Sequence, residues 1–324
     1  MRCINRSLKL TGILLIISIL LQACSSGLQF PFDPDSAISS FNIKNASSLP
    51  EIRPFAADIC VCDNDFEAMS LSIDEADAGG LFDATSAETV YAKNVHKQLS
   101  PASLTKVMTA YIALKYGHLE DTLTASSNVL ITESGAQLLG IKEGDKLTLE
   151  QALYALLLYS ANDAGVLIAE YLSGSVDSFA SVMNDEAKKL GATNTHFTNP
   201  HGLTDEEHYT TVYDLYLMMN AAMQFEEFRK IINSTEYKST YRDREGNPKT
   251  IEIKTTNAYL NGNVATPEGV SVIGGKTGTT KAAKSCLILL SNGDNGHTYI
   301  SVILGSVDHD SLYKNMTTLL TDIE

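Results

Sequence analysis

Cysteine is scarce in this sequence: the 324 residues contain five. Cys3 and Cys24 belong to an N-terminal segment described below, so Cys60, Cys62 and Cys286 remain for the rest of the chain. Three cysteines are too few for a fold that depends on disulfides. Cys60 and Cys62 have the spacing CxC without a second pair, which argues against zinc. A pair of surface thiols or a local disulfide is the simpler interpretation.

Positive charge is also in short supply. The chain has 24 lysines and arginines against 39 aspartates and glutamates, which gives a formal charge of −15 at pH 7. A protein this acidic has no electrostatic reason to bind nucleic acid or an anionic membrane surface. We therefore expect no nucleic-acid partner, and a lipid would have to hold the protein at a membrane.

The longest apolar run lies at the N-terminus. Residues 1–9 carry three basic side chains and no acidic one, and a nearly uninterrupted apolar stretch follows as far as Cys24. This order is typical of an export signal, and the stretch is short for a spanning helix and lacks a basic stop-transfer flank. Leu21-Gln22-Ala23-Cys24 resembles a bacterial lipobox. Residues 1–23 are therefore predicted to be a lipoprotein signal peptide and Cys24 the lipidated residue.

Two alternatives to lipidation stay open, namely ordinary cleavage with release and a retained anchor helix. All three place the remaining chain outside the cytoplasmic membrane. Cleavage after residue 23 removes three positive charges and takes the formal charge from −15 to −18. We expect an extracytoplasmic protein attached to the membrane by its lipid, with a secreted form as the alternative.

The rest of the chain divides into a tether and one domain. Residues 24–67 contain scattered prolines among Ser, Asn and Asp with no sustained period, which indicates a tether. Residues 68–324 begin and end with short apolar runs typical of strands, with apolar residues at helical spacing between them. This order predicts an α+β fold in which both chain ends form an antiparallel sheet and a helical lobe is inserted. A cleft between sheet and lobe is the expected place for a site.

The first candidate motif is Ser103-Leu-Thr-Lys106, at the start of a predicted helix. Residues three apart share a helix face, so the lysine could take the serine's proton if burial keeps the lysine neutral. Ser103 could instead be a helix N-cap. The same spacing occurs at Ser311 to Lys314, so this motif alone decides nothing.

Two further motifs follow. Ser160-Ala-Asn162 interrupts two apolar helical stretches with polar residues, although SxN also occurs at Ser40 and Ser126. Lys276-Thr-Gly278 occurs once, after an apolar run that predicts a strand. Glycine permits close backbone approach, and a lysine with neighbouring hydroxyls suits a carboxylate.

The order SxxK, SxN, KTG matches the motif set of penicillin-recognising serine enzymes. Ser311 lies after KTG and Ser40 lies in the tether, so neither of these copies fits. With "PASLTKVMTA" and "HFTNPHGL", about residues 70–324 resemble low-molecular-mass penicillin-binding proteins, the serine-type D-alanyl-D-alanine carboxypeptidases. The resemblance implies a β-lactamase/transpeptidase-like fold and removal of the terminal D-alanine from peptidoglycan pentapeptides. A β-lactamase or D,D-endopeptidase of the same fold, or a non-catalytic lipoprotein that binds β-lactams or wall peptides, is the alternative.

The resemblance also implies roles for individual residues. Ser103 would form the acyl-enzyme, with Lys106 as general base and Ser160 as proton relay to the leaving amine. The oxyanion would lie on the backbone N–H groups of Ser103 and Thr279. The substrate-binding side chains would be Asn162, Lys276, Thr277 and Thr279. The spacing of the histidines at 196, 201 and 208 matches no helical zinc motif, so neither a metal nor another cofactor is expected.

Two positions depart from the family pattern. Lys284 stands where members often have glycine, and no arginine follows Arg244, although members often have one after the last strand. Recognition of the substrate carboxylate would then fall to Lys276, Thr277 and Thr279, with Lys281 or Lys284 as further cations. The expected partners are peptidoglycan stem peptides, β-lactams as covalent inhibitors and the membrane. Many members have a C-terminal membrane-binding tail, which the lipid at Cys24 is expected to replace.

Overall fold

The computed structural model describes residues 58–66 and 71–323. The predicted signal peptide (1–23), Cys24 and most of the predicted tether lie outside these described residues. Within the described part of the chain, no helix combines the length and the apolar character needed to cross a bilayer.

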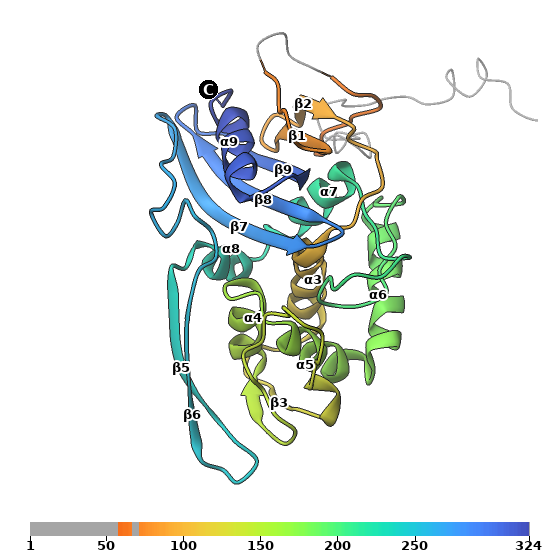
Figure 1. The fold of residues 1–324 in the computed structure, drawn as a ribbon, viewed down its shortest axis with the longest axis vertical. Coiled ribbons are helices and arrows are strands. Elements are labelled where there is room, and N and C mark those ends of the chain that lie inside the picture. Colours follow the sequence, from red (N-terminus) through yellow and green to blue (C-terminus); the bar gives the residue numbers. More distant parts are fainter. Residues whose placement is uncertain (1–57, 67–70, 324) are drawn as a thin grey trace, which may run out of the picture. The chain divides into compact units, whose positions relative to one another are not determined.

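The main sheet has five antiparallel strands in the order β2-β1-β9-β8-β7 (Figure 1). β1 pairs with β9 from Ala78 opposite Leu304 to Asp83 opposite Tyr299. The strands are β1 (Ala78–Asp83), β2 (Glu88–Lys93), β7 (Val270–Thr280), β8 (Lys284–Gly293) and β9 (Thr298–Ser306). The prediction of one sheet built from both ends of the domain is therefore confirmed.

Helices make up most of the regular secondary structure between β2 and β7. The α-helices are α3 (Lys106–Tyr116), α4 (Leu149–Leu157), α5 (Asn162–Ser173), α6 (Val176–Lys189), α7 (Val212–Ala222), α8 (Glu226–Asn233) and, after the sheet, α9 (His309–Leu320). Two 3-10 helices are η1 (Ala102–Thr105) and η2 (Ser127–Val129). α3 is the central helix, because its residues 106–113 are all buried. This is the predicted α+β fold with an inserted helical lobe.

The main sheet has a hydrophobic core on each face. Successive side chains of a strand point to opposite faces, so the apolar run in β8 serves both cores. Leu287 and Leu289 pack in one core with α9, whereas Ile288 and Leu290 pack in the other with α3 and α7. The sheet thereby lies between α9 and the helical lobe, and its edge strand β7 faces the lobe (Figure 1).

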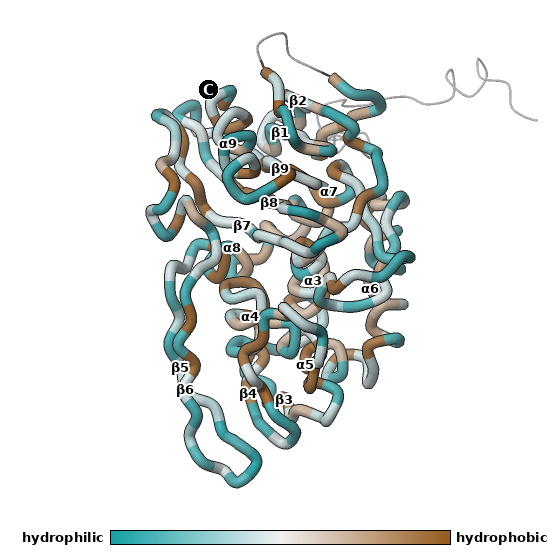
Figure 2. The backbone as a smooth tube through the Cα atoms, in the orientation of Figure 1, coloured by the Kyte–Doolittle hydropathy of each residue, from teal (hydrophilic) through white to brown (hydrophobic). Residues whose placement is uncertain are grey.

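A second, four-stranded sheet was not predicted. Its order is β3-β4-β5-β6, with β3 (Thr122–Thr124), β4 (Lys146–Thr148), β5 (Glu236–Arg242) and β6 (Pro248–Lys254). β3 and β4 are three residues each, and a single pairing of Lys146 with Arg242 joins β4 to β5. Such short strands leave little sequence pattern. Figure 2 shows the hydrophilic tip of the β5–β6 hairpin.

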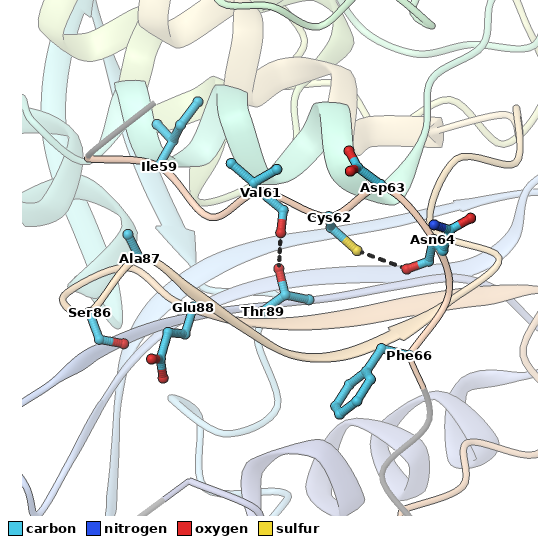
Figure 3. Close-up of a pocket in the computed structure, with 10 residues that line it drawn as sticks. All are labelled: Ile59, Val61, Cys62, Asp63, Asn64, Phe66, Ser86, Ala87, Glu88 and Thr89. Atoms are coloured by element: carbon cyan, nitrogen blue, oxygen red, sulfur yellow. Dashed lines mark hydrogen bonds between the residues drawn. The ribbon is translucent and has the colours of Figure 1, made fainter. Parts of the chain in front are cut away.

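The segment at residues 58–66 corrects the predicted domain boundary at 67. The N–H of Cys60 donates to the Tyr216 hydroxyl at 2.8 Å, and the Cys60 carbonyl accepts from Tyr213 at 2.9 Å. Figure 3 shows this segment beside the β1–β2 turn, where the Thr89 hydroxyl donates to the Val61 carbonyl at 3.3 Å. The packed domain therefore includes residue 58, about ten residues earlier than expected.

The same segment corrects the interpretation of the cysteines. Cys60, Cys62 and Cys286 are all free and buried, not surface thiols or a disulfide. Burial raises the pKa of Cys60 to about 11 and that of Cys286 to about 12, so both thiols stay protonated at neutral pH. They act as small apolar side chains of the core.

Candidate active site

Ser103 lies in η1, directly before α3. The N-cap of η1 is Pro101 and that of α3 is Thr105, and neither helix has a side-chain capping bond. The alternative that Ser103 caps a helix is therefore wrong. The step from η1 into α3 brings Nζ of Lys106 to 2.8 Å from Oγ of Ser103.

Lys106 is buried among hydrogen-bond acceptors. Its Nζ donates to Oδ1 of Asn162 at 2.7 Å and to the backbone carbonyl of His201 at 2.6 Å. Burial lowers the pKa of Lys106 far below its ordinary 10.5; the nearby charge of Lys276 lowers it further, and that of Asp163 opposes both. A neutral amine has two N–H donors and one lone pair. Because the two carbonyl oxygens can only accept, they take both donors and leave the lone pair for the Ser103 hydroxyl.

Ser160 and Asn162 lie at the corner between α4 and α5. Ser160 has φ 67°, a left-handed conformation that breaks the helical path, and Asn162 is the first residue of α5. Left-handed non-glycine residues are concentrated at functional sites, since the surrounding fold must compensate for their strain. Ser160 and Asn162 line the same cavity as Ser103, so the polar corner noted in the sequence belongs to the site.

The KTG motif lies on β7, as predicted. A Cβ added to Gly278 would lie 2.9 Å from the backbone nitrogen of Ser103, so glycine allows β7 to pass directly against the nucleophile's backbone. Lys276 is 1% exposed, and its Nζ donates to the carbonyl of Thr277 at 2.6 Å. Burial lowers the pKa of Lys276 to about 7.

These elements enclose a cavity of about 310 Å³. It is lined by Ser103, Gly135, Ala136, Gln137, Tyr159, Ser160, Asn162, Gly202, Leu203, Thr256, Thr277, Gly278, Thr279 and Thr280. Five of the seven predicted site residues line it, whereas Lys106 and Lys276 are buried and do not. Within the described ranges no charged side chain lines this cavity. Lys276 pairs with Ile288 in the sheet, so its side chain points to the face of β7 that packs against the helical lobe, where its charge acts on Lys106.

Several lining residues were missed by the sequence analysis. Gly202 has φ 84°, and a Cβ there would lie 1.8 Å from the carbonyl oxygen of Ala102, next to the nucleophile. The segment "HFTNPHGL", which contains Gly202, was noted in the sequence, but the contact of Gly202 with η1 was not predicted. Gly135, Ala136 and Gln137 come from a loop with no motif. Thr256 precedes β7 in sequence and its hydroxyl lies 2.6 Å from that of Thr277.

The histidines of this region support the site. Burial lowers the pKa of His208 to about 4, and its Nδ1 accepts from the Thr198 N–H at 3.1 Å. Its Nε2 must then carry the proton and donate to the Thr105 hydroxyl at 2.8 Å, which in turn donates to the Ala102 carbonyl. This chain fixes the 198–203 loop against η1, and with it the carbonyl of His201 that Lys106 contacts.

Two other candidates lie elsewhere. Lys284 donates to Asp77 at 2.9 Å and does not line the cavity, so its expected part in carboxylate recognition is not supported. In the second SxxK copy, the Ser311 hydroxyl donates to Glu75 at 2.9 Å, and Lys314 is exposed on α9. Neither Ser311 nor Lys314 lines the cavity that contains Ser103.

Comparisons with known proteins agree with this geometry. A family model described as D-alanyl-D-alanine carboxypeptidase matches residues 67–308. The chain is 32% identical to D-alanyl-D-alanine carboxypeptidase DacF of Bacillus subtilis (72% of this chain, 58% of that protein). It is 30% identical to DacC of Escherichia coli (76% of this chain, 60% of that protein). It thus spans about three fifths of the length of these curated relatives.

The fold is likewise similar to a solved structure. The DD-transpeptidase of Streptomyces K15 superposes with a TM-score of 0.72 at 28% identity, over 78% of this chain and 98% of that one. This confirms the β-lactamase/transpeptidase-like fold that the motif order implied. Because the family model covers most of the sequence and its motifs meet around one cavity, the chain belongs to the D-alanyl-D-alanine carboxypeptidase family of serine peptidases.

Proposed function

We propose that this protein is a serine D,D-carboxypeptidase that removes the terminal D-alanine from peptidoglycan pentapeptides. The observation that carries the proposal is the environment of Lys106. Its amine is buried, lies 2.8 Å from Oγ of Ser103 and has its donors directed to two carbonyl oxygens. A lysine held in this way is a base for the serine hydroxyl.

In the first step, Oγ of Ser103 attacks the carbonyl carbon of the D-Ala–D-Ala bond while its proton passes to Nζ of Lys106. The backbone N–H groups of Ser103 and Thr279 would bind the oxyanion, an interaction worth about 3–4 kcal/mol for each donor. The contact of Gly278 with the Ser103 nitrogen supports this assignment, since it brings the strand that carries Thr279 to that side of the nucleophile.

In the next steps the acyl-enzyme forms and is hydrolysed. The C–N bond breaks as Ser160 passes its hydroxyl proton to the leaving D-alanine nitrogen and takes up the proton that Lys106 received from Ser103. Water then cleaves the ester, which releases the shortened peptide as its carboxylic acid and restores the Ser103 hydroxyl. The α-carboxylate of the substrate would accept from the hydroxyls of Thr277 and Thr279, with Asn162 as the amide-binding side chain. Lys276, which is buried between β7 and the helical lobe and is adjacent to Thr277 in the strand, would supply positive charge to this carboxylate without lining the cavity.

Labelling with a fluorescent penicillin tests this proposal, together with D-alanine release from a pentapeptide. We expect the wild type to be labelled and to release D-alanine, and Ser103→Ala to do neither. The matched control is Ser311→Ala, which alters the second SxxK copy and should keep both activities. Labelling that survives in Ser103→Ala would refute the nucleophile. Labelling without D-alanine release in the wild type would favour a β-lactam-binding protein.

We also propose that the protein is exported and anchored by a lipid on Cys24. The basic and apolar residues before Cys24 support this, although they lie outside the described residues. Cys24→Ser should move the protein from the membrane fraction to the soluble fraction, whereas Cys3→Ser should not. A Cys24→Ser protein that stays with the membrane and keeps its leader would instead indicate a retained anchor helix.

A further inference from the structure

The wall of the cavity opposite β7 includes a loop without regular secondary structure. Gly135, Ala136 and Gln137 of this loop line the cavity. Residues 132–135 and Gln137 are exposed, so apolar packing holds this part of the loop only weakly. Hydrogen bonds to the start of α5 hold it instead: the N–H of Asn162 donates to the Gln137 carbonyl at 2.8 Å.

The largest share of these bonds goes to the carboxylate of Asp163. Its Oδ1 accepts from the N–H of Leu139 at 3.0 Å. Its Oδ2 accepts from the N–H groups of Gly140 at 2.8 Å and Ile141 at 3.0 Å. Asp163 is 1% exposed, and a buried carboxylate that accepts several backbone N–H groups forms strong, charge-assisted bonds. Three consecutive amides of the loop therefore converge on one side chain.

Asp163 also directly follows a residue of the proposed machinery. The side-chain oxygen of Asn162 accepts from Lys106, and its backbone N–H donates to the loop at Gln137. Asp163 holds the following loop residues, 139–141. The first two residues of α5 thus fix the distance between the proposed base and the far wall of the cavity. A shift of the loop would change the width of the cavity without moving Ser103 or Lys106.

We propose that Asp163 is a positioning residue for the proposed reaction: by holding residues 139–141 it fixes the 135–137 wall against which the substrate is bound for acylation. This inference rests on the proposed function. Asp163 does not line the cavity and so acts on the substrate through the loop.

The first test is Asp163→Asn. In either orientation its amide places an NH₂ group where a carboxylate oxygen now accepts backbone N–H groups, so the loop loses at least one of these bonds. We expect the amides of residues 139–141 to exchange hydrogen about tenfold faster or more, and acylation by penicillin to slow about tenfold. The matched control is Asp177→Asn, the exposed acid at the same position of α6, which should change neither rate.

A second variant separates loop position from charge. Gly140 has φ 90° and open space around its missing Cβ, so Gly140→Ala strains the loop while Asp163 keeps its charge. The acylation rate should fall, whereas the acidic limb of its pH profile should not shift. In Asp163→Asn that limb should also move to lower pH, because the carboxylate raises the pKa of Lys106 against the effects of burial and Lys276. The control is Gly174→Ala, with φ 77° and open space at the end of α5.

The outcomes are distinct. Slow acylation in both loop variants, with unchanged controls, supports the proposal. It is overturned if both loop variants are acylated within twofold of the wild-type rate, or if exchange at 139–141 is unchanged in Asp163→Asn. If Asp163→Asn does not fold, Gly140→Ala decides by the same criterion. A wild type that resists acylation contradicts the proposed function, whereas an acylated wild type with unaltered variants contradicts this inference alone.

Discussion

Replacing Lys276 by methionine should make the protein more stable and less active. The ammonium of Lys276 is 1% exposed, and burial lowers its pKa from 10.5 to about 7. A difference of this size corresponds to about 5 kcal/mol of unfavourable free energy for keeping the charged form in the fold. Methionine has a similar length and no charge, so Lys276→Met removes this cost at the expense of one hydrogen bond to the Thr277 carbonyl.

The effect depends on pH in a defined direction. Below pH 7 the lysine is charged in both the folded and the unfolded state, so the wild type carries the full cost. Between pH 7 and 10.5 the unfolded state binds more protons than the folded state, and the stability of the wild type therefore rises with pH. The free-energy advantage of Lys276→Met should shrink from about 5 kcal/mol at pH 6 to about 2 kcal/mol at pH 9, before subtraction of the lost hydrogen bond.

Urea unfolding of both proteins at pH 6, 7.5 and 9 measures this difference. Lys314→Met, which alters the exposed lysine of the second SxxK copy, is the control and should show no such trend. The pH profile of the acylation rate provides a second readout. Without the charge of Lys276 the pKa of Lys106 rises, so the acidic limb of this profile should move to higher pH. An advantage that is constant or grows with pH would refute the buried ammonium as the cause.

Three further predictions concern residues outside the proposed catalytic and substrate-binding set. Gly202→Ala should slow acylation at least tenfold and lower the melting temperature, because its Cβ would lie 1.8 Å from the Ala102 carbonyl. Lys284→Gly should change the free energy of unfolding by no more than about 1 kcal/mol and leave KM unchanged, since relief of a φ of 56° offsets an exposed ion pair with Asp77. Glu186→Gln should cost about 2–3 kcal/mol at pH 7 by urea unfolding. Although burial raises the pKa of Glu186, its two lysine partners hold it at about 2, so the wild type, unlike the variant, should lose stability as the pH falls from 4.5 to 2.

The features predicted from the sequence are those with a strong local signal. The main sheet was predictable because β8 and β9 are continuous apolar runs, and the helices because their apolar residues repeat at helical spacing. α8 was missed, since it has eight residues with three of them buried. β3 and β4 were missed because three-residue strands have no detectable period.

The features that were missed depend on contacts between distant residues. The segment at 58–66 looked like a tether, yet tyrosines 213 and 216 bind its backbone from α7. Lys276 was expected to bind substrate directly, but it is buried on the face of β7 that packs against the helical lobe, and this position depends on which way the strand's side chains point. Asp163 had no motif of its own beyond adjacency to Asn162. Its role becomes visible only when the loop amides of residues 139–141 are seen to converge on it.

The two SxxK copies show why a motif needs its surroundings. Ser103 and Ser311 are each followed by a lysine three residues later, and each lies at the beginning of a helix. Lys314 is exposed to solvent, and the Ser311 hydroxyl donates to the Glu75 carboxylate instead of meeting the lysine. Lys106 is buried, faces the charge of Lys276 and directs its donors to two carbonyl oxygens. The chemistry therefore arises from a desolvated amine with satisfied donors, and α5, β7 and the 198–203 loop must all be in place to create it.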